Sequence, residues 1–164
     1  NKRLIERKTL SHSTVEIDNT DSSQVWSNFR VAKRAYPKML SIEEQSSQLH
    51  VSCTHSGYIN QGMKVWPIRS WKLKNNIFEI CDLIKGDYNL AISRFIIHPS
   101  VKVLKKNNTT FAINLKSQKN IQIRLFDCEG KIGVARYGQE FGKSVRTQCL
   151  IIRITKLSRC QFIW

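Results

Sequence analysis

The sequence lacks the short motifs that mark the commonest nucleotide-binding and hydrolytic sites. It contains no GxGxxG stretch, no P-loop, no HExxH and no GxSxG, which excludes the dinucleotide, phosphate, zinc-peptidase and serine-hydrolase sites built on them. The adjacent carboxylates Glu43 and Glu44 are most simply a solvated turn. No group in this chain is therefore predicted to be catalytic.

The chain also lacks the patterns of a disulfide framework and of a membrane span. Its cysteines are Cys53, Cys81, Cys128, Cys149 and Cys160, with no CxxC pair, and an odd number argues against complete pairing. We expect buried free thiols, which fit a reducing compartment. No apolar run approaches the roughly 20 residues of a span, and no signal peptide is recognisable, so no membrane partner is expected. The chain starts at Asn1, and its compartment stays open between bacterial periplasm and cytoplasm.

Acidic residues are scarce, with 12 Asp and Glu against 27 Lys and Arg, and the net charge is +15. Residues 1–45 hold 8 basic and 6 acidic residues, whereas residues 46–164 hold 19 and 6. The later part should attract polyanions such as nucleic acid, anionic lipid surfaces or acidic polysaccharides. Charge alone does not choose among them.

Apolar and polar residues alternate along most of the chain, with polar turns between short segments. We predict one all-β domain over residues 1–164, an antiparallel β-sandwich of two packed sheets. Strand-turn-strand units are expected at 71–80, 101–115 and 121–135, with turns at 74–76, 107–108 and 127–130. Single strands are expected at 15–18, at 49–55 and, last, at 148–154.

Two short segments are the only candidates for helix. They are residues 24–29 and residues 41–48, where Ser41 is a candidate N-cap with Glu43 and Glu44 near the positive end of the helix. No long amphipathic helix is expected.

Five short motifs follow one another along the chain in a defined order and spacing. They are His12-Ser13-Thr14-Val15 with Ile17-Asp18; Trp26, Phe29-Arg30, Val31 and Arg34-Ala35; His55-Ser56-Gly57-Tyr58; Asp82, Ile84 and Gly86; and Phe95 with His98-Pro99. Over about residues 5–104 the chain thus resembles the C-terminal β-sandwich region of the heparinase II/III type of polysaccharide lyase.

The resemblance implies an enzyme of two parts. In that family an α-helical toroid performs β-elimination on a uronic acid, and the β-sandwich closes over the cleft. The expected partners are an acidic polysaccharide and the upstream toroid of the same protein. We expect the chain to be a fragment of a longer lyase and to be inactive alone. Tyr58 does not inherit the catalytic role of the family's tyrosine, which lies in the toroid; its ring should pack and its hydroxyl should donate or accept a hydrogen bond.

The resemblance also implies a structural zinc in the full-length protein. His12 matches the family's zinc-binding histidine, and the other ligands would lie before residue 1. The family has asparagine where this chain has Ser13, which is still a short hydrogen-bonding residue suited to a turn. Isolated histidines at 50, 55 and 98 are more simply satisfied core or edge residues.

Substrate-binding residues are predicted from chemistry on the motif segments. Arginine pairs bidentately with carboxylate or sulfate, so Arg30, Arg34 and Arg69 are candidates; the alternative for each is a solvated charge or an internal ion pair. Trp66, before Pro67, is expected to be exposed and able to stack on a sugar, whereas Trp71 is expected in the core.

Two other functions remain open. One is a non-catalytic β-domain that binds nucleic acid, suggested by the basic residues and interleaved aromatics. The other is a scaffold domain whose basic face meets an acidic protein surface.

Overall fold

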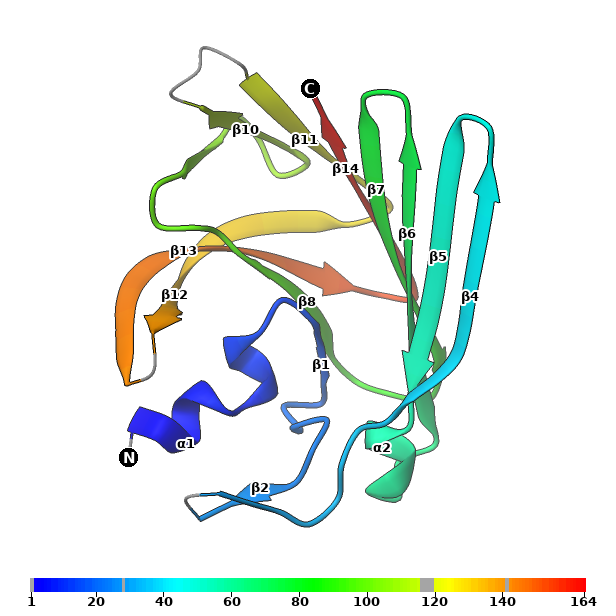
Figure 1. Ribbon diagram of the computed structural model, residues 1–164, viewed down its shortest axis with the longest axis vertical. Coiled ribbons are helices and arrows are strands. Elements are labelled where there is room, and N and C mark those ends of the chain that lie inside the picture. The colour runs from blue at the N-terminus through cyan, green and yellow to red at the C-terminus, as the bar shows by residue number, and fades with distance from the viewer. Residues whose placement is uncertain (1, 28, 116–119, 141) are drawn as a thin grey trace.

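The computed structural model describes residues 2–27, 29–115, 120–140 and 142–164, and its main strands form two packed antiparallel sheets (Figure 1). The prediction of an all-β antiparallel sandwich is confirmed. Within the described ranges, no helix is long and apolar enough to cross a membrane.

The larger sheet has eight strands and carries most of the predicted hairpins. In spatial order the strands are β4 (Pro37–Gln45), β5 (Gln48–His55), β6 (Val65–Lys74), β7 (Ile77–Gly86), β14 (Leu157–Ile163), β11 (Asn120–Phe126), β10 (Thr110–Asn114) and β9 (Lys102–Lys105). The predicted turns at 74–76 and 107–108 connect β6 to β7 and β9 to β10. Asn75 has φ +50°, a left-handed conformation that asparagine tolerates well in tight turns.

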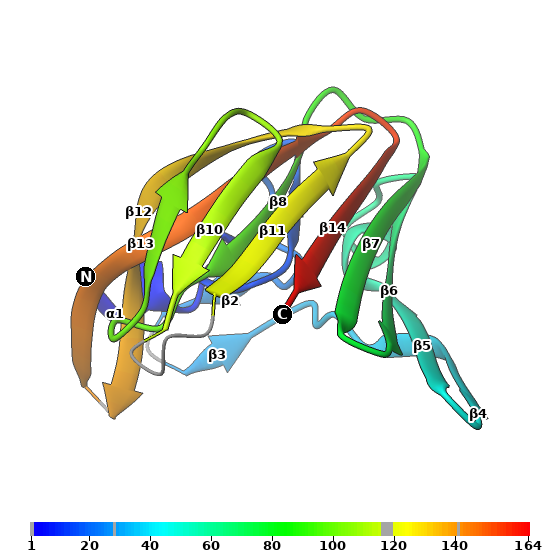
Figure 2. The same cartoon turned by 90° about the horizontal axis from the view of Figure 1, so that it is seen from above.

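The smaller sheet has four strands and includes the longest hairpin. Its order is β1 (Val15–Ile17), β8 (Ala91–Ile96), β13 (Lys143–Ile154) and β12 (Glu129–Glu140). Figure 2 shows β12 and β13 running side by side toward the N-terminal helix α1 (Lys2–Glu6). The Ser144 hydroxyl joins the hairpin to α1 by donating to Glu6 Oε1 at 2.8 Å.

Short elements complete the fold. A two-stranded ribbon joins β2 (Val25–Trp26) to β3 (Arg30–Val31). A 3-10 turn, η1 (Thr9–Ser11), leads from α1 toward β1, and the short helix α2 (Gly57–Asn60) follows β5.

The core consists of two apolar clusters. The larger lies between the sheets and joins Phe95, Leu150 and Ile152 of the small sheet to Phe111 and Ile123 of the large one. The smaller cluster surrounds β1 and α2 and consists of Val15, Ile17, Tyr58, Val65, Ile84, Ala91 and Ile154. Burial of each such side chain contributes about 1.5–3 kcal/mol, so both clusters stabilise the packing of the sheets.

A buried ion pair connects the two sheets. Arg69 of β6 donates from Nε and Nη2 to the carboxylate of Asp82 in β7, at 2.7 and 2.9 Å. The same guanidinium reaches the small sheet, donating to the Ser13 carbonyl at 2.7 Å and to Ser93 Oγ at 2.9 Å. Asp82 is almost fully buried, and a buried carboxylate needs this kind of pairing.

Tyr58 fastens α2 to the first strand. Its side chain is fully buried, its hydroxyl donates to the Val15 carbonyl at 2.9 Å, and it accepts from the Ile17 amide at 3.2 Å. The prediction that Tyr58 packs its ring and hydrogen-bonds its hydroxyl is confirmed.

Both predicted helices are wrong. Residues 41–48 belong to β4, β5 and the turn between them, and the Ser41 hydroxyl contacts Glu43 at 3.3 Å without capping a helix. In the described part of residues 24–29, Val25–Trp26 forms β2. Pairing with β5 and β3 outweighs the weak local preference of such short segments. Within the described ranges the α-helices are α1 and α2, and neither was predicted.

Two expected connections are also corrected. The turn at 127–130 does not close a hairpin, because β11 belongs to the large sheet and β12 to the small one. Asp127 turns the chain at φ +62°, and the strands separate beyond it. The strand at 148–154 forms within β13, but β14 follows it.

The cysteines and Trp71 lie as expected in most respects. All five cysteines are free; Cys149 and Cys160 are buried, and the other three are partly buried. Trp71 is partly buried and packs against the larger core cluster.

We expect Asp82→Asn to lower the free energy of unfolding by about 3–5 kcal/mol, because it leaves the Arg69 charge inside the protein without its counterion. Urea unfolding at neutral pH measures the change. Asp127→Asn is the matched control: its pair with Arg159 is 3.1 Å long but both side chains are about half exposed, so its loss should stay below about 1 kcal/mol. Equal losses in the two variants would contradict the structural role of the buried pair.

Candidate functional site

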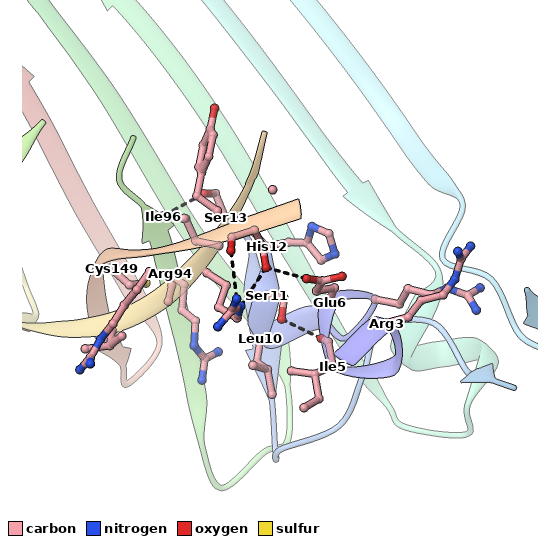
Figure 3. Close-up of a pocket in the computed structure, with 18 of the residues that line it drawn as sticks. Arg3, Ile5, Glu6, Leu10, Ser11, His12, Ser13, Arg94, Ile96 and Cys149 are labelled. Carbon is pink, nitrogen blue, oxygen red and sulfur yellow. Dashed lines mark hydrogen bonds between the residues drawn. The ribbon is translucent and has the colours of Figure 1, made fainter. Parts of the chain in front are cut away.

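A groove lies between the N-terminal segment and the β12–β13 hairpin (Figure 3). Its volume is about 1270 Å³. Ile96 of β8 and Cys149 and Ile151 of β13 line its apolar part, and Ser11, His12 and Ser13 lie along the same groove. Segments far apart in the sequence therefore form one site.

The groove is strongly basic. Six cationic side chains and two carboxylates line it, a formal excess of four positive charges. The cationic residues are Arg3, Arg7, Arg94, Arg136, Lys143 and Arg146; the carboxylates are Glu6 and Glu140. Positive charge gathered in a concave site concentrates anionic ligands there.

Contacts within the chain fix several of these groups. Arg136 donates from Nε to Ser144 Oγ at 2.8 Å and from Nη2 to the Ser144 carbonyl at 2.9 Å. The Ser144 hydroxyl in turn donates to Glu6, which links the hairpin to α1. Lys143 and Glu140 form an exposed ion pair at 2.7 Å.

Arg94 supplies a cation that is mostly buried. Its Nη1 lies 2.8 Å from Oε2 of the buried Glu16, in the neighbouring strand β1. This pair fixes the charge of Arg94 within the sheet while the residue still lines the groove.

His12 is exposed at the groove, directly after η1. Its backbone amide donates to the Thr9 carbonyl at 3.1 Å, and its carbonyl accepts from Thr14 at 2.9 Å. In the described ranges no group of three His, Cys, Asp or Glu side chains is placed to hold a metal ion, and zinc needs three or four ligands. The described residues do not fit zinc on their own, and the zinc role of His12 stays a prediction.

The four predicted substrate-binding residues are dispersed. Arg30 is exposed on β3, with its guanidinium 5.0 Å from the centre of the Trp26 ring. Its carbonyl accepts from Arg7 of the groove at 3.5 Å, so the ribbon adjoins the groove. Arg34 is exposed near α2, and Trp66 lies opposite Lys85 at the start of β6. The expected exposure of Trp66 is confirmed, at 36%.

Arg69 is engaged inside the fold. Four hydrogen bonds to Asp82, Ser13 and Ser93 occupy its guanidinium. Its role in glycan binding stays a prediction, and Arg69 is not among the residues that line the groove.

Sequence reasoning missed all six cations of the groove. Arg3 lies in α1 and Arg7 directly follows it, whereas Arg136, Lys143 and Arg146 come from a hairpin more than a hundred residues later. For the cations of the hairpin the available signal was the basic excess after residue 45, whereas Arg3 and Arg7 lie before it. That excess predicts a positive electrostatic field, but it does not show where on the fold the basic side chains gather.

Four of the five thiols are poor nucleophiles. Burial raises the pKa of Cys81, Cys149 and Cys160, and it raises that of Cys128 to about 11. Since the thiolate is the reactive form, these four groups stay protonated at neutral pH. Cys149 therefore gives the groove an apolar wall.

Comparison with known proteins identifies a family match. The family described as Heparinase II/III-like, C-terminal matches residues 1–163. No curated protein sequence matches the chain.

Solved structures share the fold at low sequence identity. The Heparinase III-BT4657 gene product has a TM-score of 0.74 and 15% identity, covering 99% of this chain and 25% of that chain. Heparan sulfate lyase HepC from Pedobacter heparinus has a TM-score of 0.75 and 14% identity, with the same coverage of 99% and 25%. The chain therefore spans about a quarter of the length of these two structures.

His55 should make stability depend on pH. Burial lowers its pKa, and its Nδ1 accepts a hydrogen bond from the Gly57 amide at 3.2 Å. Below about pH 6.5 the unfolded chain binds a proton that the folded state resists, so the free energy of unfolding falls as the pH falls. We expect His55→Gln to reduce this fall between pH 7 and pH 5, as measured by urea unfolding. An unchanged pH dependence would contradict the assignment; His98→Gln, at an exposed site, is the control.

Proposed function

Because this chain belongs to the heparinase II/III-like C-terminal family, we propose that it is the glycan-binding β-sandwich part of a lyase acting on a uronate-containing polysaccharide. Its task is to hold the anionic chain and to close over the cleft in which β-elimination occurs. The observation that carries this proposal is the basic groove between α1 and the β12–β13 hairpin.

The chemistry of the groove suits an acidic glycan. Five of its six cations are arginines. Arg94 pairs with Glu16 inside the sheet, and the planar guanidinium of the other four suits carboxylate or sulfate, with which it forms two parallel hydrogen bonds. Apolar surface from Ile96, Cys149 and Ile151 lies beside these charges. This combination suits an acidic sugar, which presents both charged groups and an apolar ring face. One of the similar structures is named as a heparan sulfate lyase, and heparan sulfate is an anionic polysaccharide.

The proposal places the chemical step on another part of the protein. β-Elimination needs a base for the C5 proton, an acid for the leaving oxygen and a group that neutralises the carboxylate. Arginines of the groove can do only the last of these. Tyr58 is buried, its hydroxyl is held by β1, and burial raises its pKa well above its usual range, so it does not supply the base. We propose that base and acid belong to a helical toroid.

We expect the chain to bind heparan sulfate at least about tenfold more tightly than single-stranded DNA of similar charge, a difference of about 1.4 kcal/mol. Calorimetric titration at one physiological salt concentration measures both affinities, with neutral dextran as the control for sugar alone. Matched salt is essential because both polyanions release counterions. Equal or tighter binding of DNA would favour a nucleic-acid-binding domain and contradict the proposal.

We also expect the chain alone to release no unsaturated uronide from heparan sulfate, hyaluronan or alginate. The ultraviolet absorbance of the new double bond measures this, and an active lyase run in parallel shows that the assay works. Product formed by the chain alone would place the base and acid within residues 1–164.

A further inference from the structure

Two arginines of the groove face each other across the β12–β13 hairpin. Arg136 and Arg146 are directly paired in the ladder, which puts their Cβ atoms about 5 Å apart on one face. Like charges in this arrangement repel and destabilise a hairpin. The groups around the pair must therefore show whether the chain itself offsets this repulsion.

The pair has no carboxylate ion-pair partner in the part of the chain that the structure describes. Among the ion pairs formed by the described residues, none includes Arg136 or Arg146. Of the two carboxylates that line the groove, Glu140 pairs with Lys143 and Glu6 accepts from Ser144. The two guanidinium groups thus face the groove without a direct ion pair to a described carboxylate, and the Ser144 hydroxyl links Glu6 to Arg136 through hydrogen bonds.

Arg136 is also held in position. Its two hydrogen bonds to Ser144 orient the guanidinium plane, and the bond from Ser144 to Glu6 anchors that contact to α1. A side chain fixed in advance loses less conformational entropy when a ligand binds. This arrangement favours binding of an anion over simple solvation of a surface charge.

Arg146 stands where two grooves meet. A second groove of about 410 Å³ shares Val134 and Arg146 with the first and adds Lys102 and Pro99. Basic groups thus continue from Arg136 through Arg146 to Lys102. The first groove alone exceeds the roughly 300–1,000 Å³ of a typical small-molecule site, so there is room for several sugar rings.

We propose that Arg136 and Arg146 form an anion clamp at this junction, and that its ligand is an extended acidic polysaccharide with charged groups on successive sugars. One carboxylate or sulfate lies between the two guanidinium groups, and the chain continues toward Lys102. This inference rests on the proposed function. It deepens that function by naming the binding residues and by requiring a ligand several sugars long.

The test is calorimetric titration of the chain with heparin oligosaccharides of increasing length at constant salt. Wild type should bind the octasaccharide at least about tenfold more tightly than the disaccharide, and Arg146→Ala should lose about tenfold for the octasaccharide. Arg153→Ala is the matched control, because Arg153 is exposed on the same strand but lies opposite Glu129. Its loss should stay below about twofold.

A second variant separates loss of the clamp from loss of the fold. Arg146→Glu places opposite charges across the ladder, so it should raise Tm by a few degrees while it abolishes octasaccharide binding. A lower Tm, or binding equal to wild type, would overturn the clamp.

The outcomes distinguish this inference from the proposed function. If wild type binds no heparin oligosaccharide of any length, the proposed function fails and the clamp fails with it. If wild type binds but Arg146→Ala and Arg153→Ala lose equally, or affinity does not rise with length, the clamp alone is wrong.

Discussion

The arrangement of the two sheets depends on the buried ion pair of Arg69 and Asp82. This pair lies in the large sheet, yet the Arg69 guanidinium also binds the Ser13 carbonyl and the Ser93 hydroxyl beside the small sheet. Ser13 is held a second time, because its hydroxyl accepts from the Ile96 amide at 3.0 Å. The His12–Ser13 turn that borders the groove is therefore positioned from the core.

Internal and external charges of this protein have different surroundings. Arg69 and Arg94 are mostly buried and each has a buried carboxylate partner. Arg136 and Arg146 lie at the groove and face each other. Pairing satisfies the charges that the fold encloses, whereas the charges left facing the groove are available to a ligand. In our account the stability of the sandwich and its capacity to bind anions thus reside in separate sets of arginines.

Strand positions were largely predictable, and sheet membership was not. Alternation identified β1 and β5, and asparagine-rich turns identified the hairpins at 74–76 and 107–108, because both signals are local. The sandwich class followed from them. The turn at 127–130 has the composition of a hairpin turn, but β11 and β12 pair with distant strands. The helix predicted over 41–48 failed for the same reason, since pairing with β5 is not visible in the segment itself.

The site was less predictable than the fold. The sequence shows that Arg69 is cationic, but its burial beside Asp82 follows from the register of β6 and β7. Arg30 was chosen for its motif and adjoins the groove through Arg7. The clamp residues Arg136 and Arg146 lie ten positions apart on strands with no strong motif, and only the ladder brings them together. Family resemblance identified the correct family, while the position of the basic groove required the structure.

The measurement that tests the central claim most directly is a nuclear magnetic resonance titration of the isotope-labelled chain with a heparin octasaccharide. The account predicts that backbone amide shifts concentrate at the groove, on Ser13, Arg136, Ser144 and Arg146. Basic residues on the outer face of the large sheet, such as Lys72, Arg124 and Arg159, should change little. Shifts spread evenly over all basic surfaces, or centred on the large sheet, would contradict a glycan site between α1 and the β12–β13 hairpin.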